Sequence, residues 1–495
     1  RRAWNEYRQA REAAGIHFDL KEVAPPPVPD DENFALTPVV ASCYLQMLNE
    51  HGQRHPYNTN VVNQLNFNLY FPDSAIAQKD LKIGSWQKGT FTDLRPWQNY
   101  YRAQPTTTAP AQSVAEAPFP VSPQPQTPAV DVLLALSKYD ATLDALRAAA
   151  KLPYARFPLE YDSAEPPTIL LPHLANIKKT VVFLQLRSIA ELDAGQPDQA
   201  LADWKLGLRC NEALRQEPFL ISQLVEIAGQ NILTQPLWEG LARHQWSDVQ
   251  LADIEATLAG QDYPANFRTG MLGELACGIG SVEYLRRSRN FGELVSWTSS
   301  SRQNDMPDPM ELLYAMAFHL MPDGWFYQME RNLAQMYERY SLPLVDQTNR
   351  IISPTLNRQL ATEAGIRLQT KSVANAATRL LFPALGRASL KTAQCQTMVN
   401  EARIACALER YRLAHGQYPD SLADLTPQFL VTVPHDLING EPLHYRREAG
   451  DRFTLYSVGW NQRDDGGRVV LGKGETPSAD PDQGDWVWTY PAHVD

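Results

Sequence analysis

The sequence predicts a mainly α-helical protein with a small α+β module at its C-terminal end. Apolar residues recur with helical periodicity over 129–260, and further helices are expected at 310–340 and 355–381. Residues 261–310 carry loop signals and are expected to interrupt the helices. A long helical pattern over 387–415 then gives way to short alternating segments that are typical of strands.

The chain of 495 residues is expected to contain about two to four domains, because one hydrophobic core rarely extends over so many residues. Residues 1–103 are predicted as an N-terminal region of extended and mixed structure, since prolines at 24–32 enforce extended backbone. Residues 104–128, rich in Pro, Thr, Ala, Gln and Ser, are predicted as a linker or a surface loop. Residues 129–385 form the predicted multi-helix body, and residues 386–495 the α+β module.

One pair of helices in the predicted body looks like a tetratricopeptide-type hairpin. Apolar residues from Ile177 to Leu192 fall on one helical face, and the next helix presents Ala200 and Trp204 after a turn at 195–198. A stable array of such repeats needs about three or more units. Since one convincing unit is present, we expect a helical bundle that contains this hairpin, and a true solenoid is the alternative.

The C-terminal module shows a fixed order of signals. Gly416 is expected just after the end of the long helix, and Pro419 prevents the helix from resuming. Asn439-Gly440 is a strong hairpin-turn dipeptide. The segments 443–446 and 453–458 alternate as strands that can pair. We therefore predict a helix, a turn and a small antiparallel sheet.

This module resembles the globular domain of the type II secretion major pseudopilins. The resemblance is carried by residues 408–419, by the turn at 434–440 and by Leu-Tyr-Ser-Val-Gly at 455–459, which together cover less than a fifth of the chain. A pseudopilin helix begins at the N-terminus as a hydrophobic stalk. Here the helix follows a large body and contains Lys391 and Asn400, so assembly into a pilus by stalk packing is not expected.

The whole chain also resembles a set of bacterial envelope proteins that couple a helical body to such a tail. The segments that carry this resemblance are 25–31, 235–240 and 484–488. It implies an envelope-anchored protein and supplies no activity. Because the chain begins at Arg1 and not at Met, we expect that residues upstream were cleaved, trimmed or left out, and a signal peptide or a membrane anchor is one form that such a segment could take. The predicted location is therefore extracytoplasmic, either periplasmic or membrane-anchored.

Composition and motifs exclude several function classes. A formal net charge of -11 argues against nucleic-acid binding, which needs a surplus of Lys and Arg on one face. No stretch reaches the roughly 18–20 apolar residues that cross a bilayer. The five cysteines lie far apart without zinc spacing. GxSxG, P-loop, GxGxxG and HExxH motifs are absent from the sequence. No catalytic or cofactor-binding residue is therefore predicted.

One ion site is predicted from the pseudopilin resemblance, which implies calcium in the loop after the Leu-Tyr-Ser strand. Asn461, Asp464 and Asp465 are the expected side-chain ligands, since calcium takes oxygen ligands, and Gly466-Gly467 would allow the chain to wrap tightly. The alternative is a solvated acidic turn in which Asn461 or Asp464 accepts local backbone N–H bonds.

Three function classes follow from these observations. The predicted function is a non-catalytic envelope scaffold or protein-interaction protein whose partners are other envelope proteins. The first alternative is a component of a type II secretion or pilus-like apparatus, which a prepilin-type leader would distinguish. The second is an extracytoplasmic hydrolase, which would show a deep cleft with two converging carboxylates. Whether the protein is an enzyme stays open, with no catalytic activity favoured.

Overall fold

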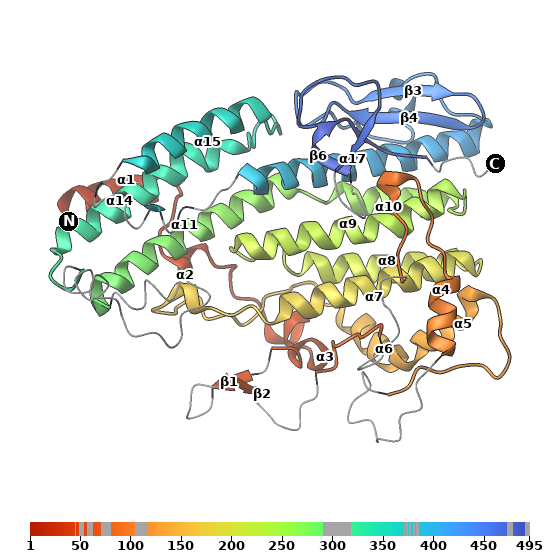
Figure 1. Ribbon diagram of the computed structural model, residues 1–495, viewed down its shortest axis with the longest axis horizontal. Coiled ribbons are helices and arrows are strands. Elements are labelled where there is room, and N and C mark those ends of the chain that lie inside the picture. The colour runs from red at the N-terminus through yellow and green to blue at the C-terminus, as the bar shows by residue number, and fades with distance from the viewer. Residues whose placement is uncertain are drawn as a thin grey trace.

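The computed structural model describes residues 1–44, 46–48, 54–56, 63–70, 81–103, 117–290, 318–370, 372, 375, 378–379, 382, 386–472 and 479–490. Residues 104–116 of the predicted linker, and residues 310–317 of the expected helix, lie outside the described residues. The described part is mainly helical, with small antiparallel sheets near its C-terminal end, which confirms the predicted fold class at this level (Figure 1).

The described helices and strands follow the chain in this order. The helices up to the centre of the body are α1 (Arg2–Glu12), α2 (Leu20–Val23), α3 (Pro38–Ala41), α4 (Arg95–Arg102), α5 (Pro128–Leu136), α6 (Asp140–Ala149), α7 (His173–Asp193), α8 (Pro197–Glu212), α9 (Leu220–Ala242) and α10 (Asp248–Ala259). They are followed by α11 (Tyr263–Ser288), α14 (Asp323–Tyr340), α15 (Pro354–Gln369) and α17 (Gly386–His415). The strands are β1 (Gln46–Leu48), β2 (Arg54–Pro56), β3 (His444–Glu448), β4 (Arg452–Ser457), β5 (Val469–Leu471), β6 (Ala479–Gly484) and β7 (Trp486–Val487).

Helices α7, α8 and α9 stack side by side in the centre of the molecule (Figure 1). The turn between α7 and α8 uses Gly195 at a φ of +73°, a conformation that glycine adopts without steric cost. Gly229 on α9 leaves room for the Asn211 side chain of α8, since a Cβ built there would lie 1.9 Å from Asn211 Oδ1. The Asn211 Nδ2 donates to the Glu226 carbonyl over 2.8 Å and ties the two helices together.

Helix α9 continues through Pro236, although proline removes one helical hydrogen bond and blocks the carbonyl four residues earlier. That carbonyl belongs to Ile232, and it accepts a hydrogen bond of 2.8 Å from Gln185 Nε2 on α7. The next carbonyl, of Leu233, accepts one of 3.0 Å from Trp204 Nε1 on α8. The helix therefore tolerates its proline because neighbouring side chains satisfy the freed backbone.

The loop expected over 261–310 is wrong in its first part, because residues 263–288 form the long helix α11. Its glycines reduce helix propensity, but here they allow close packing. A Cβ at Gly273 would lie 1.6 Å from the Pro218 carbonyl oxygen, and one at Gly278 would lie 2.8 Å from Leu333 Cδ2. Tertiary packing thus overrides the local preference, and α11 packs against α9 and α14.

The principal C-terminal sheet has the order β3-β4-β7 and is antiparallel, and β5 pairs with β6. The predicted strand pair is confirmed, with His444 opposite Tyr456. The turn that joins β3 to β4 lies at Gly450 and Asp451, both with positive φ. Asn439-Gly440 instead turns the chain inside a separate bridge between His435 and Pro442. That dipeptide therefore marks a turn before the sheet rather than the hairpin itself.

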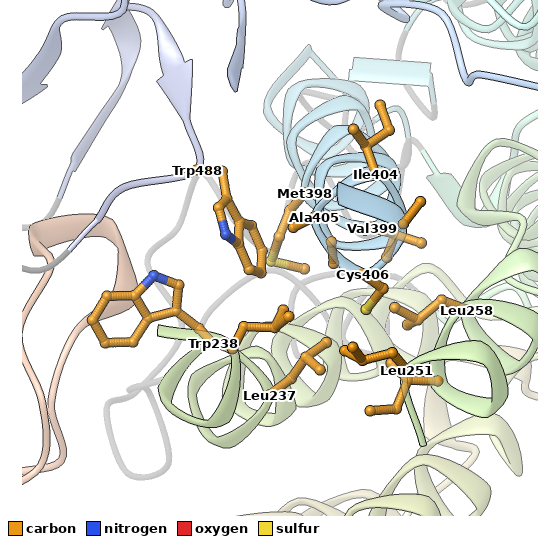
Figure 2. Packing of buried hydrophobic residues seen from close by; sticks show 14 of the residues in the cluster. Leu237, Trp238, Leu251, Leu258, Met398, Val399, Ile404, Ala405, Cys406 and Trp488 are labelled. Atoms are coloured by element: carbon orange, nitrogen blue, oxygen red, sulfur yellow. The ribbon is translucent and has the colours of Figure 1, made fainter. Parts of the chain in front are cut away.

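Helix α17 lies between the helical body and the C-terminal sheet (Figure 1). Its buried residues occur on most sides of the helix, in keeping with this position. Val399 and Cys406 face α9 and α10, while Met398 and Ala405 lie near Trp488 from the C-terminal end (Figure 2). One hydrophobic cluster therefore contains residues of α8, α9, α10, α17 and the sheet.

Candidate functional site

Residues 84–92 and 486–490, which are far apart in the sequence, both contact residues 235–240 of α9. We call these three segments together the junction. Gln235 and Glu239 bind residues 84–92. The Gln235 Oε1 accepts the backbone N–H of Trp86 over 2.6 Å. The Glu239 Oε1 accepts both the backbone N–H of Thr92, at 3.0 Å, and its hydroxyl, at 2.7 Å.

Trp238 holds the C-terminal segment. Its indole Nε1 donates to the Thr489 carbonyl over 2.6 Å, and its ring is 1% exposed. Trp86 and Trp488 pack with ring centroids 5.7 Å apart. Two of the segments that carry the envelope-protein resemblance, 235–240 and 484–488, therefore come together. The third does not join them: the Pro25 carbonyl accepts from Arg156 Nε.

A polar network on Glu409 lies beside the junction. The carboxylate accepts hydrogen bonds from Arg412, at 2.6 and 2.9 Å, and from the Tyr418 hydroxyl, at 2.9 Å, and His244 Nδ1 lies 2.9 Å away. Burial raises the pKa of Glu409, but the hydrogen bonds from Arg412 and His244 outweigh it and hold the pKa below its usual value. The cavity that Glu409 lines measures about 10 Å³, room for one water. The network is therefore closed by its own hydrogen bonds, with little free space beside it.

The predicted calcium ligands lie in one loop, and the structure brings two of them together. Asn461 Nδ2 donates to Asp465 Oδ2 over 2.9 Å. Asp464 has other partners: its Oδ1 accepts from the Tyr456 hydroxyl and from the Gly466 N–H, each over 2.9 Å. Among the described residues, no group of three or more His, Cys, Asp or Glu side chains is arranged to hold a metal.

The acid that organises this loop is Asp485, which the sequence did not single out as a site residue. Its carboxylate accepts the backbone N–H groups of Asp465, Gly467 and Arg468, at 3.2, 2.7 and 3.2 Å. Burial raises the pKa of Asp485, because its side chain is almost fully enclosed, while the three donors favour the ionised form. The sequence signal that could have indicated this acceptor is the Gly484-Asp485 dipeptide, which lies between β6 and β7.

Replacing Asp485 with alanine is expected to destabilise the protein by about 1–3 kcal/mol, because three backbone donors lose a shared acceptor. Urea unfolding measures this change, and faster hydrogen exchange at Asp465, Gly467 and Arg468 locates it in the loop. Asp482→Ala is the matched control, since its pairing with Arg387 is at the surface and such pairs contribute at most about 1 kcal/mol. Equal stability losses in both variants would contradict the proposed anchoring.

Two buried carboxyl groups lie between α17 and the sheet. Asp436 accepts the N–H groups of Ile438 and Val458, at 2.9 and 3.1 Å. Glu401 on α17 accepts the Ser457 N–H, and its Oε1 has no hydrogen-bond partner among the described residues. Burial, reinforced by the nearby Asp436, raises the pKa of Glu401 well above its usual value. This pair holds the end of β4 against the helix.

Stability is expected to fall as the pH rises from about 5 to 9. Burial raises the pKa of Glu226 and that of Glu330 from 4.5 to about 8. The folded protein then holds protons that the unfolded chain releases, so this stabilisation is complete below pH 4.5 and is lost as the pH rises through 8. Thermal unfolding across this range checks the direction.

The carboxyl group of Glu330 has no hydrogen-bond partner among the described residues, so Glu330→Gln should reduce the fall in melting temperature. The exposed residue Glu441 supplies the control, and Glu441→Gln should leave the pH profile unchanged. A melting temperature that rises towards pH 9 in the parent protein would show the sign to be wrong.

A polar cleft of about 220 Å³ lies between α2, α11 and the loop at 161–166. Two of its acidic residues have partners within the fold: Asp19 caps α2 by accepting the Lys21 N–H, and Glu283 pairs with Arg287 over 3.2 Å.

Comparisons of the chain with protein-family models, with curated proteins and with solved structures give no match. No helix in the described ranges has both the length and the apolarity that spanning a bilayer requires. The class that the fold defines is therefore a mainly helical protein with small C-terminal antiparallel sheets.

Proposed function

We propose that the protein is a non-catalytic scaffold or protein-interaction protein of the cell envelope. The observation that carries this proposal is the junction, where the C-terminal segment is bonded to α9 through Trp238 and Thr489. The nearby ionisable network on Glu409 leaves space for one water only. The junction therefore fixes the orientation of the sheet on the helical body. A protein that positions its partners needs a fixed orientation of this kind.

The sheet supplies a surface for a partner, because β3 is one of its two edge strands. An edge strand offers backbone N–H and C=O groups to which a further strand can be added. Arg446, Arg447 and Glu448 on this strand are exposed. Addition of a partner strand along β3 is therefore the interaction that we propose for the module.

The proposal includes two finer assignments of the fold. We assign the α7–α8 hairpin as tetratricopeptide-like, because the two helices pack against each other and Ala190, Ala200 and Trp204 are buried. We assign residues 386–495 as pseudopilin-like, on the order of long helix, turn at Gly416 and antiparallel sheet.

A component of a type II secretion or pilus-like apparatus is the second candidate, favoured by the same order of elements. Helix α17 would not act as a filament stalk in this arrangement, because α9, α10, α11 and β4 already pack against it. The candidate therefore takes the form of a partner of the apparatus rather than a subunit of its filament.

Photo-crosslinking of the full-length protein in its native cells tests the scaffold proposal. A photoreactive residue in place of Arg446 on β3 should give a discrete crosslinked species that sits in the envelope fraction. The control position is Val249 on α10, which is 77% exposed and should give no such species. The proposal would be contradicted if the protein were recovered only from the cytosol, or if both positions gave equal crosslinking.

Calcium binding by Asn461, Asp464 and Asp465 stays a prediction within this proposal. Their oxygens already accept hydrogen bonds: Asn461 Oδ1 from the Arg463 N–H, Asp464 from Tyr456 and Asp465 from Asn461. A calcium ion would share these oxygens with their present hydrogen-bond donors, so the donor set fits the ion only in part. The acidic turn closed by its own hydrogen bonds is the competing account.

Thermal unfolding with millimolar calcium and with a chelator decides between the two. A bound ion stabilises the folded state by mass action, so calcium should raise the melting temperature of the parent protein. The double variant Asp464→Asn, Asp465→Asn should lose this rise, and magnesium serves as the ion control. An unchanged melting temperature of the parent protein would reject the calcium site.

A further inference from the structure

A cavity of about 500 Å³ lies between α15 and the start of α17, apart from the junction and the acidic loop. Its walls are mainly apolar. Leu360 and Leu368 come from α15, Leu390 from α17, Phe382 from the segment before it, and Trp460 from the C-terminal module. Pockets for small molecules in proteins measure about 300–1,000 Å³ and have walls of this kind.

Helix α15 keeps this cavity open with a glycine in its interior. Gly365 lines the cavity, and a Cβ built on it would meet no atom within 4 Å. An interior helical glycine costs about 1 kcal/mol relative to alanine, and at this position no close packing compensates for the cost. The residue therefore leaves space free where a larger side chain would fit the backbone.

The size of the cavity suits a single apolar chain. A chain of this kind would lie inside a cavity of about 500 Å³ and contact its walls on several sides.

The mouth of the cavity carries both signs of charge. Arg387, whose side chain is 71% exposed, pairs with Asp482, which is 38% exposed, through Nη1 and Oδ2 at 2.7 Å. The guanidinium group has five N–H donors, and this bond uses one of them. A ligand head with an anionic group and a cationic group can therefore bind both side chains at once.

From these observations we propose that the cavity between α15 and α17 binds a single-chain zwitterionic lipid. The acyl chain lies between Leu360, Leu390 and Trp460, the head phosphate binds Arg387, and the head ammonium binds Asp482. This site goes beyond the scaffold proposal and does not depend on it.

Isothermal titration of the full chain with lauroyl-lysophosphatidylethanolamine, below its micelle concentration, tests the site. We expect saturable binding with one lipid per chain. Gly365→Trp fills the cavity and should weaken binding at least tenfold without lowering the melting temperature. The matched control is Gly324→Trp on α14, where a Cβ also meets no atom within 4 Å and which does not line the cavity. Absence of saturable binding, or equal binding by both variants, would overturn the proposal.

The head group is tested with lauroyl-lysophosphatidylglycerol, which has the same chain and a purely anionic head. The parent protein should bind it about tenfold more weakly, since Asp482 has no cation to pair with and repels the phosphate. Asp482→Asn should remove this preference by improving the binding of the anionic lipid. Arg387→Gln should weaken both lipids. Equal affinities for the two lipids in the parent protein would exclude the assigned roles of Arg387 and Asp482.

Discussion

Gly273→Ala is expected to destabilise the protein by about 3 kcal/mol or more. The Cβ that alanine adds would lie 1.6 Å from the Pro218 carbonyl oxygen, so α11 and the backbone before α9 would have to separate. Overpacking of a close-packed interior commonly costs about 1–3 kcal/mol, and here the obstacle is backbone that cannot rotate away. Urea unfolding measures the loss.

Gly365→Ala is the control for this substitution, because it introduces the same methyl group into an open helix position. It should stabilise the protein by up to about 1 kcal/mol through improved helix propensity. If both glycine variants are stabilised, the close contact of α11 with Pro218 does not exist in solution.

Trp238→Ala is expected to cost about 3–5 kcal/mol, the usual range for removing a large buried aromatic side chain. The indole packs against Phe91, with ring centroids 5.2 Å apart, and it bonds the Thr489 carbonyl. The variant should therefore also release the C-terminal segment to proteases. Urea unfolding and limited proteolysis of the full chain measure the two effects.

Trp238→Phe separates packing from hydrogen bonding at the same position. It keeps an aromatic ring but loses the donor to Thr489, so we expect a smaller cost of about 1–2 kcal/mol. If Trp238→Ala left the C-terminal segment as resistant to proteases as in the parent protein, the junction would not be what holds it.

The local structure of this chain could be predicted well where neighbours in sequence decide it. Helical periodicity located α7 to α10. Gly416 has the positive φ expected at a helix end. Helix α11 was missed because its glycines act through distant partners such as Pro218 and Leu333, which no sequence window contains.

The junction could not be predicted because its bonds join residues far apart in the chain. Gln235 and Trp86 are 149 positions apart, and Trp238 and Thr489 are 251 apart. The sequence showed the segments 235–240 and 484–488 as separate motifs without indicating their contact. In the acidic loop, Asn461 and Asp465 are close in sequence and form a hydrogen bond. The central acceptor of the loop, Asp485, lies 20 positions after Asp465.

The position of α17 between body and sheet has a consequence for the order in which the molecule folds. Thr489 bonds the Gln87 carbonyl across 402 positions, and Trp488 belongs to the same hydrophobic cluster as α8 to α10. The helices can form early, but this cluster can close only after residues 488 and 489 have been synthesised. Contacts of such long range slow folding, since a large loop must close before they stabilise anything.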